Sequence, residues 1–391
     1  MSALIEGLNP QQIAAVKHEG SPLLVVAGAG SGKTRVLTRR IAYLLAQRNV
    51  APYEVLAITF TNKAAGEMKE RVAQLVGDRA KAMWVSTFHS ACVRILRKEA
   101  SLLGYTNSFT IYDQSDSLRL ITLVMRDLNL DAKRYAPRAV AALISQAKNE
   151  LMGPADYLNQ SKDQFQEIVA QVFAIYQKRL SGANSMDFDD LIAKTVEVLQ
   201  RHPETRAKYR SRFKHILVDE YQDTNHAQYV LIKELVGSAS DSFTLAELCV
   251  VGDADQSIYA FRGANIRNIL QFEADYPEAK TILLEQNYRS TQNILSAANA
   301  VISNNEGRKE KNLWSENGAG STIVGYVAES EHDEADFVVR EIGRLRDLAK
   351  SNPGDTAIFY RTNAQSRVFE EVFMRVGIPY KVVGGVRFYE R

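Results

Sequence analysis

The stretch Leu23-Leu-Val-Val-Ala-Gly28-Ala-Gly-Ser-Gly-Lys-Thr34 decides the fold of this chain. Its apolar first half is typical of a buried strand, and residues 33–47 repeat apolar side chains at helical spacing. Glycines between a strand and a helix let backbone N–H groups surround phosphate oxygens, and the helix N-terminus adds partial positive charge. The pattern therefore predicts a phosphate-binding loop, with a glycine-rich turn that binds no ligand as the alternative. The candidate nucleotide-binding residues are Gly28, Ala29, Gly30, Ser31, Gly32, Lys33, Thr34 and Arg35.

Two side chains of this stretch carry the expected chemistry. Lys33 is expected to reach the β- and γ-phosphates of a bound nucleotide, and the Thr34 hydroxyl to bind Mg²⁺. The second half of such a site is an acidic residue at the end of an apolar strand, which residues 216–220, Ile-Leu-Val-Asp-Glu, supply. We predict that Asp219 holds Mg²⁺ and that Glu220 orients or deprotonates the attacking water. Paired acids after a strand are otherwise commonly a charge bias at a helix N-terminus.

Strand-like and helix-like segments alternate on both sides of the glycine-rich turn. Residues 55–60 predict a second strand, and strands that alternate with amphipathic helices indicate a parallel sheet. Helical periodicity then prevails between residues 106 and 214, and the strand pattern resumes at residues 215–219, 248–252 and 281–284. We therefore predict an α/β fold whose parallel sheet is interrupted by a helical insertion.

A second α/β unit is predicted beyond a polar stretch at residues 309–320. Residues 323–327, 331–349, 356–360, 365–376 and 380–383 repeat a β-α-β-α-β pattern. Three strands are few for a complete sheet, so we expect this unit to be incomplete and the chain to be part of a longer polypeptide. The predicted domains are 1–107 (first ATP-binding domain, first segment), 108–214 (helical insertion), 215–282 (first domain, second segment) and 283–391 (second domain, incomplete).

The composition limits the possible partners. The chain of 391 residues has 48 Lys and Arg against 46 Asp and Glu, so its formal charge of +2 excludes a uniformly basic coat for duplex DNA. Two cysteines exclude a disulfide framework and a four-cysteine zinc site. The N-terminus resembles no secretory signal, and no apolar run approaches the ~18 residues that span a bilayer. We expect a soluble, cytoplasmic protein without a membrane partner, whose nucleic-acid contacts are local.

Aromatic side chains at predicted strand ends are candidates for such contacts. Ligands of a parallel α/β sheet gather at the carboxyl ends of its strands, where aromatic rings can stack on bases of any sequence. The alternative for each ring is ordinary core packing, and for each lone polar residue a solvated loop. The candidate DNA-binding residues are Phe60, Asn62, His89, Tyr259, Phe261, Arg262, Arg361 and Asn363.

The order of these motifs resembles one family along nearly the whole chain. From about residue 8 onward they are similar to the successive motifs of UvrD/PcrA/Rep-type superfamily 1 DNA helicases. The segments that carry the resemblance are residues 8–12, 28–34, 58–65, 86–90, 218–224, 252–263 and 284–290, with later segments at 360–367 and 383–389.

The resemblance implies two RecA-like domains, with ATP bound between them and single-stranded DNA across their top. The first is the P-loop sheet with its helical insertion, and the second is the incomplete α/β unit. By matching position, Gln12 and Tyr288 would contact adenine, although a surface role is the plainer interpretation of Gln12 alone. Gln256 would sense the γ-phosphate, and Arg289 would contact it.

Two departures from the family matter. The family's carboxy-terminal motifs, which include a further phosphate-contacting arginine, do not occur in the sequence, and such an arginine is worth about 10³–10⁵ in kcat. We therefore expect poor ATP hydrolysis by this segment alone. Phe261 stands where the family usually has tryptophan, which keeps a stacking ring of smaller area.

The resemblance predicts the amino-terminal portion of an ATP- and Mg²⁺-dependent helicase that moves 3′ to 5′ in DNA repair or replication restart. Expected partners are single-stranded DNA, junctions of single and double strands, and DNA-repair proteins. The alternatives are a P-loop NTPase switch without a nucleic-acid partner, a non-catalytic ATP- or DNA-binding module, and a subunit of a helicase–nuclease.

Overall fold

The structure is a computed structural model that describes residues 4–237, 245–260, 263–305, 308–348 and 350–383. The chain divides into two compact units, residues 1–320 and 321–391. The candidate DNA-binding residues Phe261 and Arg262 lie outside the described residues.

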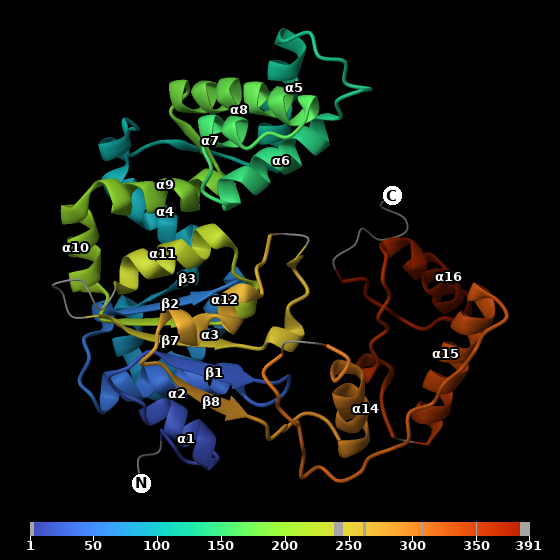
Figure 1. Cartoon of the computed structure of the whole chain (residues 1–391). Coiled ribbons are helices and arrows are strands. Elements are labelled where there is room, and N and C mark those ends of the chain that lie inside the picture. The colour runs from blue at the N-terminus through green and yellow to red at the C-terminus, as the bar shows by residue number, and fades with distance from the viewer. Residues whose placement is uncertain (1–3, 238–244, 261–262, 306–307, 349, 384–391) are drawn as a thin grey trace. The chain divides into compact units, whose positions relative to one another are not determined.

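The larger unit is built on a parallel sheet (Figure 1). Within the described residues its strands are β1 (Leu23–Ala27), β2 (Val55–Thr59), β3 (Trp84–Thr87), β6 (His215–Val218), β7 (Glu247–Gly252) and β8 (Lys280–Leu284). They lie in the order β3-β2-β6-β7-β1-β8, and every neighbouring pair is parallel. The predicted α/β class is confirmed. The strands predicted at residues 23–27, 55–60, 215–219, 248–252 and 281–284 are confirmed as β1, β2, β6, β7 and β8. The sequence analysis missed β3, whose four residues are too few for a recognisable pattern.

Helices cover both faces of this sheet. The described helices of the unit are α1 (Pro10–Lys17), α2 (Lys33–Ala46), α3 (Asn62–Val76), α4 (Phe88–Glu99), α5 (Gln114–Asp127), α6 (Pro137–Asn149), α7 (Pro154–Asn159), α8 (Gln164–Gly182), α9 (Phe188–Arg201), α10 (Pro203–Arg212), α11 (His226–Val236), α12 (Arg267–Leu270), α13 (Phe272–Asp275) and α14 (Gln292–Ile302).

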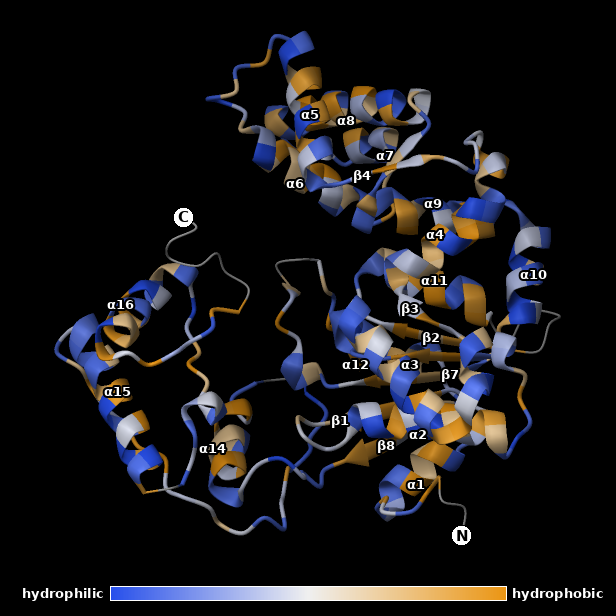
Figure 2. Ribbon diagram, turned by 180° about the vertical axis from the view of Figure 1, so that it is seen from behind, coloured by the Kyte–Doolittle hydropathy of each residue, from blue (hydrophilic) through white to orange (hydrophobic). Residues whose placement is uncertain are grey.

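Alternate strand residues enter two separate cores. Leu24 and Val26 of β1 pack with α4, α9 and α11, whereas Leu23 and Val25 pack with α1, α2 and α3. Successive side chains of a strand point to opposite faces, so a strand buried on both faces is apolar throughout. All five residues of β1 are accordingly buried, and Figure 2 shows hydrophobic colour along the strands and two-toned helices around them.

The helical stretch between β3 and β6 has two parts. Helices α5, α6 and α8 enclose a third core that includes Val124, Ile144 and Phe173, and they lie beyond α9 and α4 in both ribbon views. Helix α9 instead packs against α4 and α11 in the core of the sheet. A small parallel ladder of β4 (Thr110–Tyr112) and β5 (Ser185–Asp187), also missed from the sequence, pairs the segment before α5 with the segment after α8.

The strand order brings the expected site residues together. Strand β7 lies between β1 and β6, so the segments that follow these three strands meet at one edge of the sheet. These segments are the glycine-rich turn at residues 28–34, the acids from residue 219 onward and the segment from residue 253 to 256.

The smaller unit contains the two predicted helices, α15 (Glu331–Asp347) and α16 (Ser366–Val376). The strands expected at residues 323–327, 356–360 and 380–383 are not formed, and that prediction is wrong for the described residues. A parallel sheet needs paired neighbours and covered faces, whereas Val327 is 95% exposed and Phe359 94% exposed. The segment before α15 is instead bonded to the start of that helix, because the Tyr326 hydroxyl donates to Asp333 at 2.8 Å.

Candidate nucleotide and nucleic-acid site

The glycine-rich turn has the backbone that its glycines allow. Gly30 and Gly32 have φ of +73° and +88°, in the left-handed region that glycine adopts most readily. Gly32 is also the N-cap of α2, and no side chain caps that helix. The uncapped helix start therefore faces the turn with its positive end, as a phosphate site requires.

Protein donors engage the carbonyl oxygens of four successive turn residues. The Ser31 hydroxyl donates to the Gly28 carbonyl at 2.7 Å, and Gln12 Nε2 donates to the Ser31 carbonyl at 2.9 Å. Asn287 Nδ2 donates to the Ala29 carbonyl at 2.5 Å, and the Tyr288 N–H donates to the Gly30 carbonyl at 3.0 Å. These donors offset the negative partial charge of the four carbonyl oxygens, so the turn repels a phosphate less. Asn287 was missed from the sequence, although it stands directly before the predicted Tyr288 and Arg289.

Lys33 lies between an acid and an amide from the segments that follow β6 and β7. Its Nζ donates to Glu220 Oε2 at 2.8 Å and to Gln256 Oε1 at 3.1 Å. The lysine side chain is 11% exposed and that of Glu220 is 37% exposed, so the pair is only partly screened by water. The structure therefore brings together three of the predicted catalytic residues.

The acids after β6 are held close to one another. Asp219 is 6% exposed, and burial together with the nearby Glu220 carboxylate raises its pKa to about 6. The Glu220 N–H donates to Asp219 Oδ1 at 3.0 Å, and Glu220 itself has a φ of +48°. A left-handed backbone at a non-glycine residue is strained and is often found at functional sites.

Thr34 and Asp219 line one pocket of about 770 Å³, together with Glu220 and Gln256. Hydroxyl and carboxylate oxygens are the donors that Mg²⁺ prefers, with the remaining ligands from water and phosphate. No group of three or more His, Cys, Asp or Glu side chains in the described ranges is placed to hold a metal alone. The donors present therefore fit an ion that arrives with a nucleotide.

The predicted adenine contacts lie beside α1. Gln12 is fully buried, and its Oε1 accepts from the N–H of Asn9, the N-cap residue of α1. The Tyr288 hydroxyl accepts from Asn9 Nδ2 at 3.0 Å, and the ring is 43% exposed. Arg289 lies at the turn, where a Cβ added to Gly30 would come within 2.8 Å of the arginine Cβ. Their roles toward adenine and phosphate stay predictions.

Three of the predicted DNA-binding residues line the same pocket as the acids: Phe60, His89 and Tyr259. The rings of Phe60 and Phe88 pack edge to face at 5.7 Å between centroids, as do those of His89 and Phe188 at 5.6 Å. Burial lowers the pKa of His89 below its ordinary value, which favours the neutral ring. The Tyr259 ring is 38% exposed, and Asn62 is exposed at the start of α3.

Arg361 and Asn363 belong to the smaller unit and are exposed there. The Arg361 N–H donates to Gln365 Oε1 at 2.9 Å, and Asn363 begins a short 3₁₀ turn before α16. Both therefore lie just before that helix, and their DNA contacts stay predictions.

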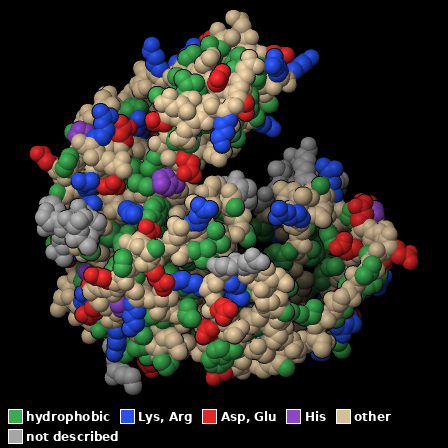
Figure 3. Space-filling model, in the orientation of Figure 1, with side chains coloured by type: hydrophobic (Ala, Val, Ile, Leu, Met, Phe, Trp, Pro, Cys, Tyr) green, Lys and Arg blue, Asp and Glu red, His purple; other side chains and the backbone are tan. Residues whose placement is uncertain are grey.

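The pocket also receives polar residues that the sequence analysis did not single out. Ser145 and Asn149 of α6 and Asp189 of α9 line it, and Asn225 Nδ2 donates to Asn149 Oδ1 at 2.7 Å. They come from the helical insertion, far from the P-loop in sequence, so no local pattern links them to it. Figure 3 shows positive and negative side chains intermixed on the face in view, which agrees with local rather than general basic character.

The parallel sheet, the glycine-rich turn and the acids after β6 place this chain among the P-loop α/β proteins. A family model described as the UvrD/REP helicase N-terminal domain matches residues 8–277, and one described as the UvrD-like helicase C-terminal domain matches residues 282–391. The chain belongs to the UvrD/REP helicase family. Both matched domains agree with the predicted RecA-like architecture.

Curated relatives cover nearly all of this chain. The ATP-dependent DNA helicase UvrD1 of Mycobacterium tuberculosis (strain H37Rv) is 64% identical over 393 residues, which are 99% of this chain and 51% of the relative. UvrD1 of Mycobacterium leprae is 60% identical over 396 residues (99% and 51%), and the ATP-dependent DNA helicase PcrA of Staphylococcus aureus (strain NCTC 8325) is 54% identical over 391 residues (100% and 53%). The chain thus spans about half the length of the curated relatives it matches. No helix among its described residues is long and apolar enough to cross a membrane.

Proposed function

We propose that this chain is the ATP-binding part of a DNA helicase that moves 3′ to 5′ along single-stranded DNA in repair or replication restart. The observation that carries the proposal is the shared pocket, because Thr34, Asp219 and Glu220 line it together with Phe60, His89 and Tyr259. Phosphate chemistry and rings suited to stacking on bases thus occur on one surface. The printed names of the relatives, ATP-dependent DNA helicases, support the same assignment.

The contacts of Lys33 suggest how the nucleotide is sensed. A γ-phosphate beside the turn competes for the Lys33 ammonium, which now bonds to Glu220 and Gln256. Once Lys33 turns to phosphate, Glu220 is released to orient water. Gln256 Oε1 accepts from Lys33 or from that water, because an ionised phosphate has no proton to donate. Mg²⁺ held through Thr34 and Asp219 would neutralise phosphate charge.

Coupling to DNA follows from the sequence distance between Gln256 and Tyr259, which is three residues. A nucleotide can shift the position of the ring only if it binds one arrangement of this segment better than the other. Gln256 lies at the end of the 3₁₀ turn Ala254–Gln256, three residues before Tyr259, so a movement of Gln256 would shift the short segment that carries the ring. This assigns the segment after β7 to the link between ATP and DNA.

The proposal is tested by ATP hydrolysis with and without a single-stranded oligonucleotide, on this chain and on the full-length protein. We expect strong stimulation by the oligonucleotide in the full-length protein and loss of turnover in Lys33→Ala. The direction of movement is measured by displacement of streptavidin from biotin-labelled oligonucleotides. A protein that moves 3′ to 5′ should displace streptavidin from the 5′ end and not from the 3′ end. Turnover that the oligonucleotide leaves unchanged would instead favour a P-loop switch without a DNA partner.

A further inference from the structure

Residues 308–313, which we call the 308–313 strap, follow α14 in the sequence and contact the residues that follow β7. Lys311 Nζ contacts Asp253 Oδ1 at 2.5 Å and also pairs with Asp255. Arg308 forms a two-bond pair with Asp255, at 3.1 Å from Nε and 2.9 Å from Nη2. None of the strap residues was among the predicted site residues, and none belongs to the phosphate turn.

The strap is itself held against the turn. The Leu313 N–H and carbonyl oxygen both bond to the Asn299 side chain of α14, at 3.4 and 3.0 Å. A Cβ added to Gly28 would come within 2.4 Å of Leu313 Cδ2, so the leucine packs directly on the glycine. The strap therefore has a defined position relative to the phosphate turn.

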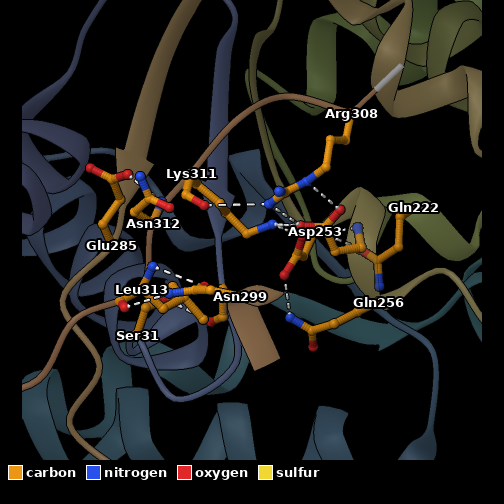
Figure 4. Close-up of polar contacts among 12 residues, drawn as sticks. Ser31, Gln222, Asp253, Gln256, Glu285, Asn299, Arg308, Lys311, Asn312 and Leu313 are labelled. Atoms are coloured by element: carbon orange, nitrogen blue, oxygen red, sulfur yellow. Dashed lines mark hydrogen bonds and ion pairs between the residues drawn. The ribbon is translucent and has the colours of Figure 1, made fainter. Parts of the chain in front are cut away.

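A continuous chain of polar contacts leads from the strap to the P-loop lysine. Asp253 uses Oδ1 for Lys311 and Oδ2 to accept from Gln256 Nε2 at 2.6 Å, as Figure 4 shows. The other end of that amide, Gln256 Oε1, accepts from Lys33 Nζ at 3.1 Å. An ionised carboxylate can only accept hydrogen bonds, so Asp253 binds the NH₂ end of the Gln256 amide. The oxygen end of that amide is therefore the one that faces Lys33.

Asp253 needs a cation in order to do this. It is 2% exposed, and a carboxylate buried without a cation carries a large desolvation cost, which it reduces by turning toward water. Lys311, with a side chain 4% exposed, supplies the charge from the strap. Loss of the ammonium thus frees Gln256 without removing any group from the nucleotide pocket.

We propose that Lys311 is a positioning residue that holds Gln256, through Asp253, with Oε1 toward Lys33, so that a γ-phosphate bound by Lys33 is sensed through the Lys33–Gln256 bond. The inference rests on the proposed function, since it requires a nucleotide at the turn. It assigns Lys311 to the discrimination of ATP from ADP and not to nucleotide affinity in general.

The test compares binding of MgADP and of Mg²⁺ with a non-hydrolysable ATP analogue, by titration calorimetry on residues 1–391, so that turnover is not needed. We expect the wild type to prefer the triphosphate. In Lys311→Met the preference should fall about tenfold, the value of one hydrogen bond to a charged group, as in Gln256→Ala. The Kd for MgADP should stay within about twofold of wild type.

Lys309→Gln is the matched control, because Lys309 lies on the same strap but pairs at 2.7 Å with Glu273. The double variant Lys311→Met with Asp253→Asn should regain part of the preference, because an asparagine oxygen still accepts from Gln256 and carries no charge. Equal weakening of both nucleotides in Lys311→Met, or a preference equal to that of Lys309→Gln, overturns the inference. Wild type that binds neither nucleotide contradicts the proposed function itself, whereas wild type that binds both equally refutes only the sensing role.

Discussion

Replacing Lys148 should destabilise the junction between the helical insertion and the sheet. Lys148 of α6 is buried, with Nζ at 2.6 Å from Asp187 and 2.9 Å from Asp190 at the start of α9. Both carboxylates have side chains less than a tenth exposed, so Lys148→Met leaves them without a cation in a poorly solvated place. Breaking such a buried pair from one side costs about 3–5 kcal/mol.

The contacts that remain favour the lower end of that range. Asp187 keeps the Tyr176 hydroxyl at 2.8 Å and the Asp190 N–H at 2.8 Å, and Asp190 keeps Gln177 Nε2 at 3.2 Å. We therefore expect a loss of about 3 kcal/mol in the free energy of unfolding of the larger unit. Urea denaturation at pH 7, followed by circular dichroism, measures it as a lower midpoint with an unchanged m-value.

The loss should depend on pH with a definite sign. In the wild type Lys148 holds the pKa of Asp187 below its ordinary value, so this stabilisation is present above the unfolded pKa and is lost as pH falls through the folded one. In the variant the acids take up protons more readily, so the difference from wild type should narrow as pH falls toward 4. Lys194→Met is the matched control, because Lys194 pairs with Glu197 in a partly exposed i,i+3 pair and should cost about 0–1 kcal/mol. If Lys148→Met costs no more than Lys194→Met, or if its deficit grows at low pH, the reasoning is refuted.

Two further predictions follow from other contacts. Tyr259→Ala should weaken the affinity for single-stranded DNA by about 1–3 kcal/mol without changing ADP affinity, as measured by fluorescence anisotropy. The control is Tyr53→Ala, because Tyr53 is 55% exposed and lies just before the start of β2, at the end of the strand away from the pocket. Equal DNA affinity of Tyr259→Ala and wild type would show that the Tyr259 ring has only a packing role. Glu247→Gln should destabilise the unit above pH 5, because the Arg48 guanidinium, bonded to Glu247 at 2.7 and 2.8 Å, holds the carboxyl pKa below its ordinary value. That difference should shrink as pH falls below about 4.5, where the unfolded carboxyl is protonated; a difference that does not change with pH would show that charge plays no part.

Local patterns were enough to identify five of the six described strands of the main sheet and the two halves of its phosphate site. The β1–turn–α2 segment is readable because strand burial, glycine backbone freedom and helix periodicity all act within a dozen residues. The same holds for Asp219, which follows an apolar strand directly. The strands expected in the smaller unit failed for the complementary reason: an apolar run becomes a strand only when another strand pairs with it, and pairing is not a local property.

The sequence by itself determined that a P-loop is present, which residues can carry its chemistry and which faces of its helices are apolar. Only the tertiary structure decided that β7 lies between β1 and β6, so that Gln256 and Glu220 both reach Lys33. It alone brought Lys311 to Asp253 from 58 positions away. Strand order and ion pairing across such distances depend on how complete sheets and cores pack, and no window of sequence contains that information.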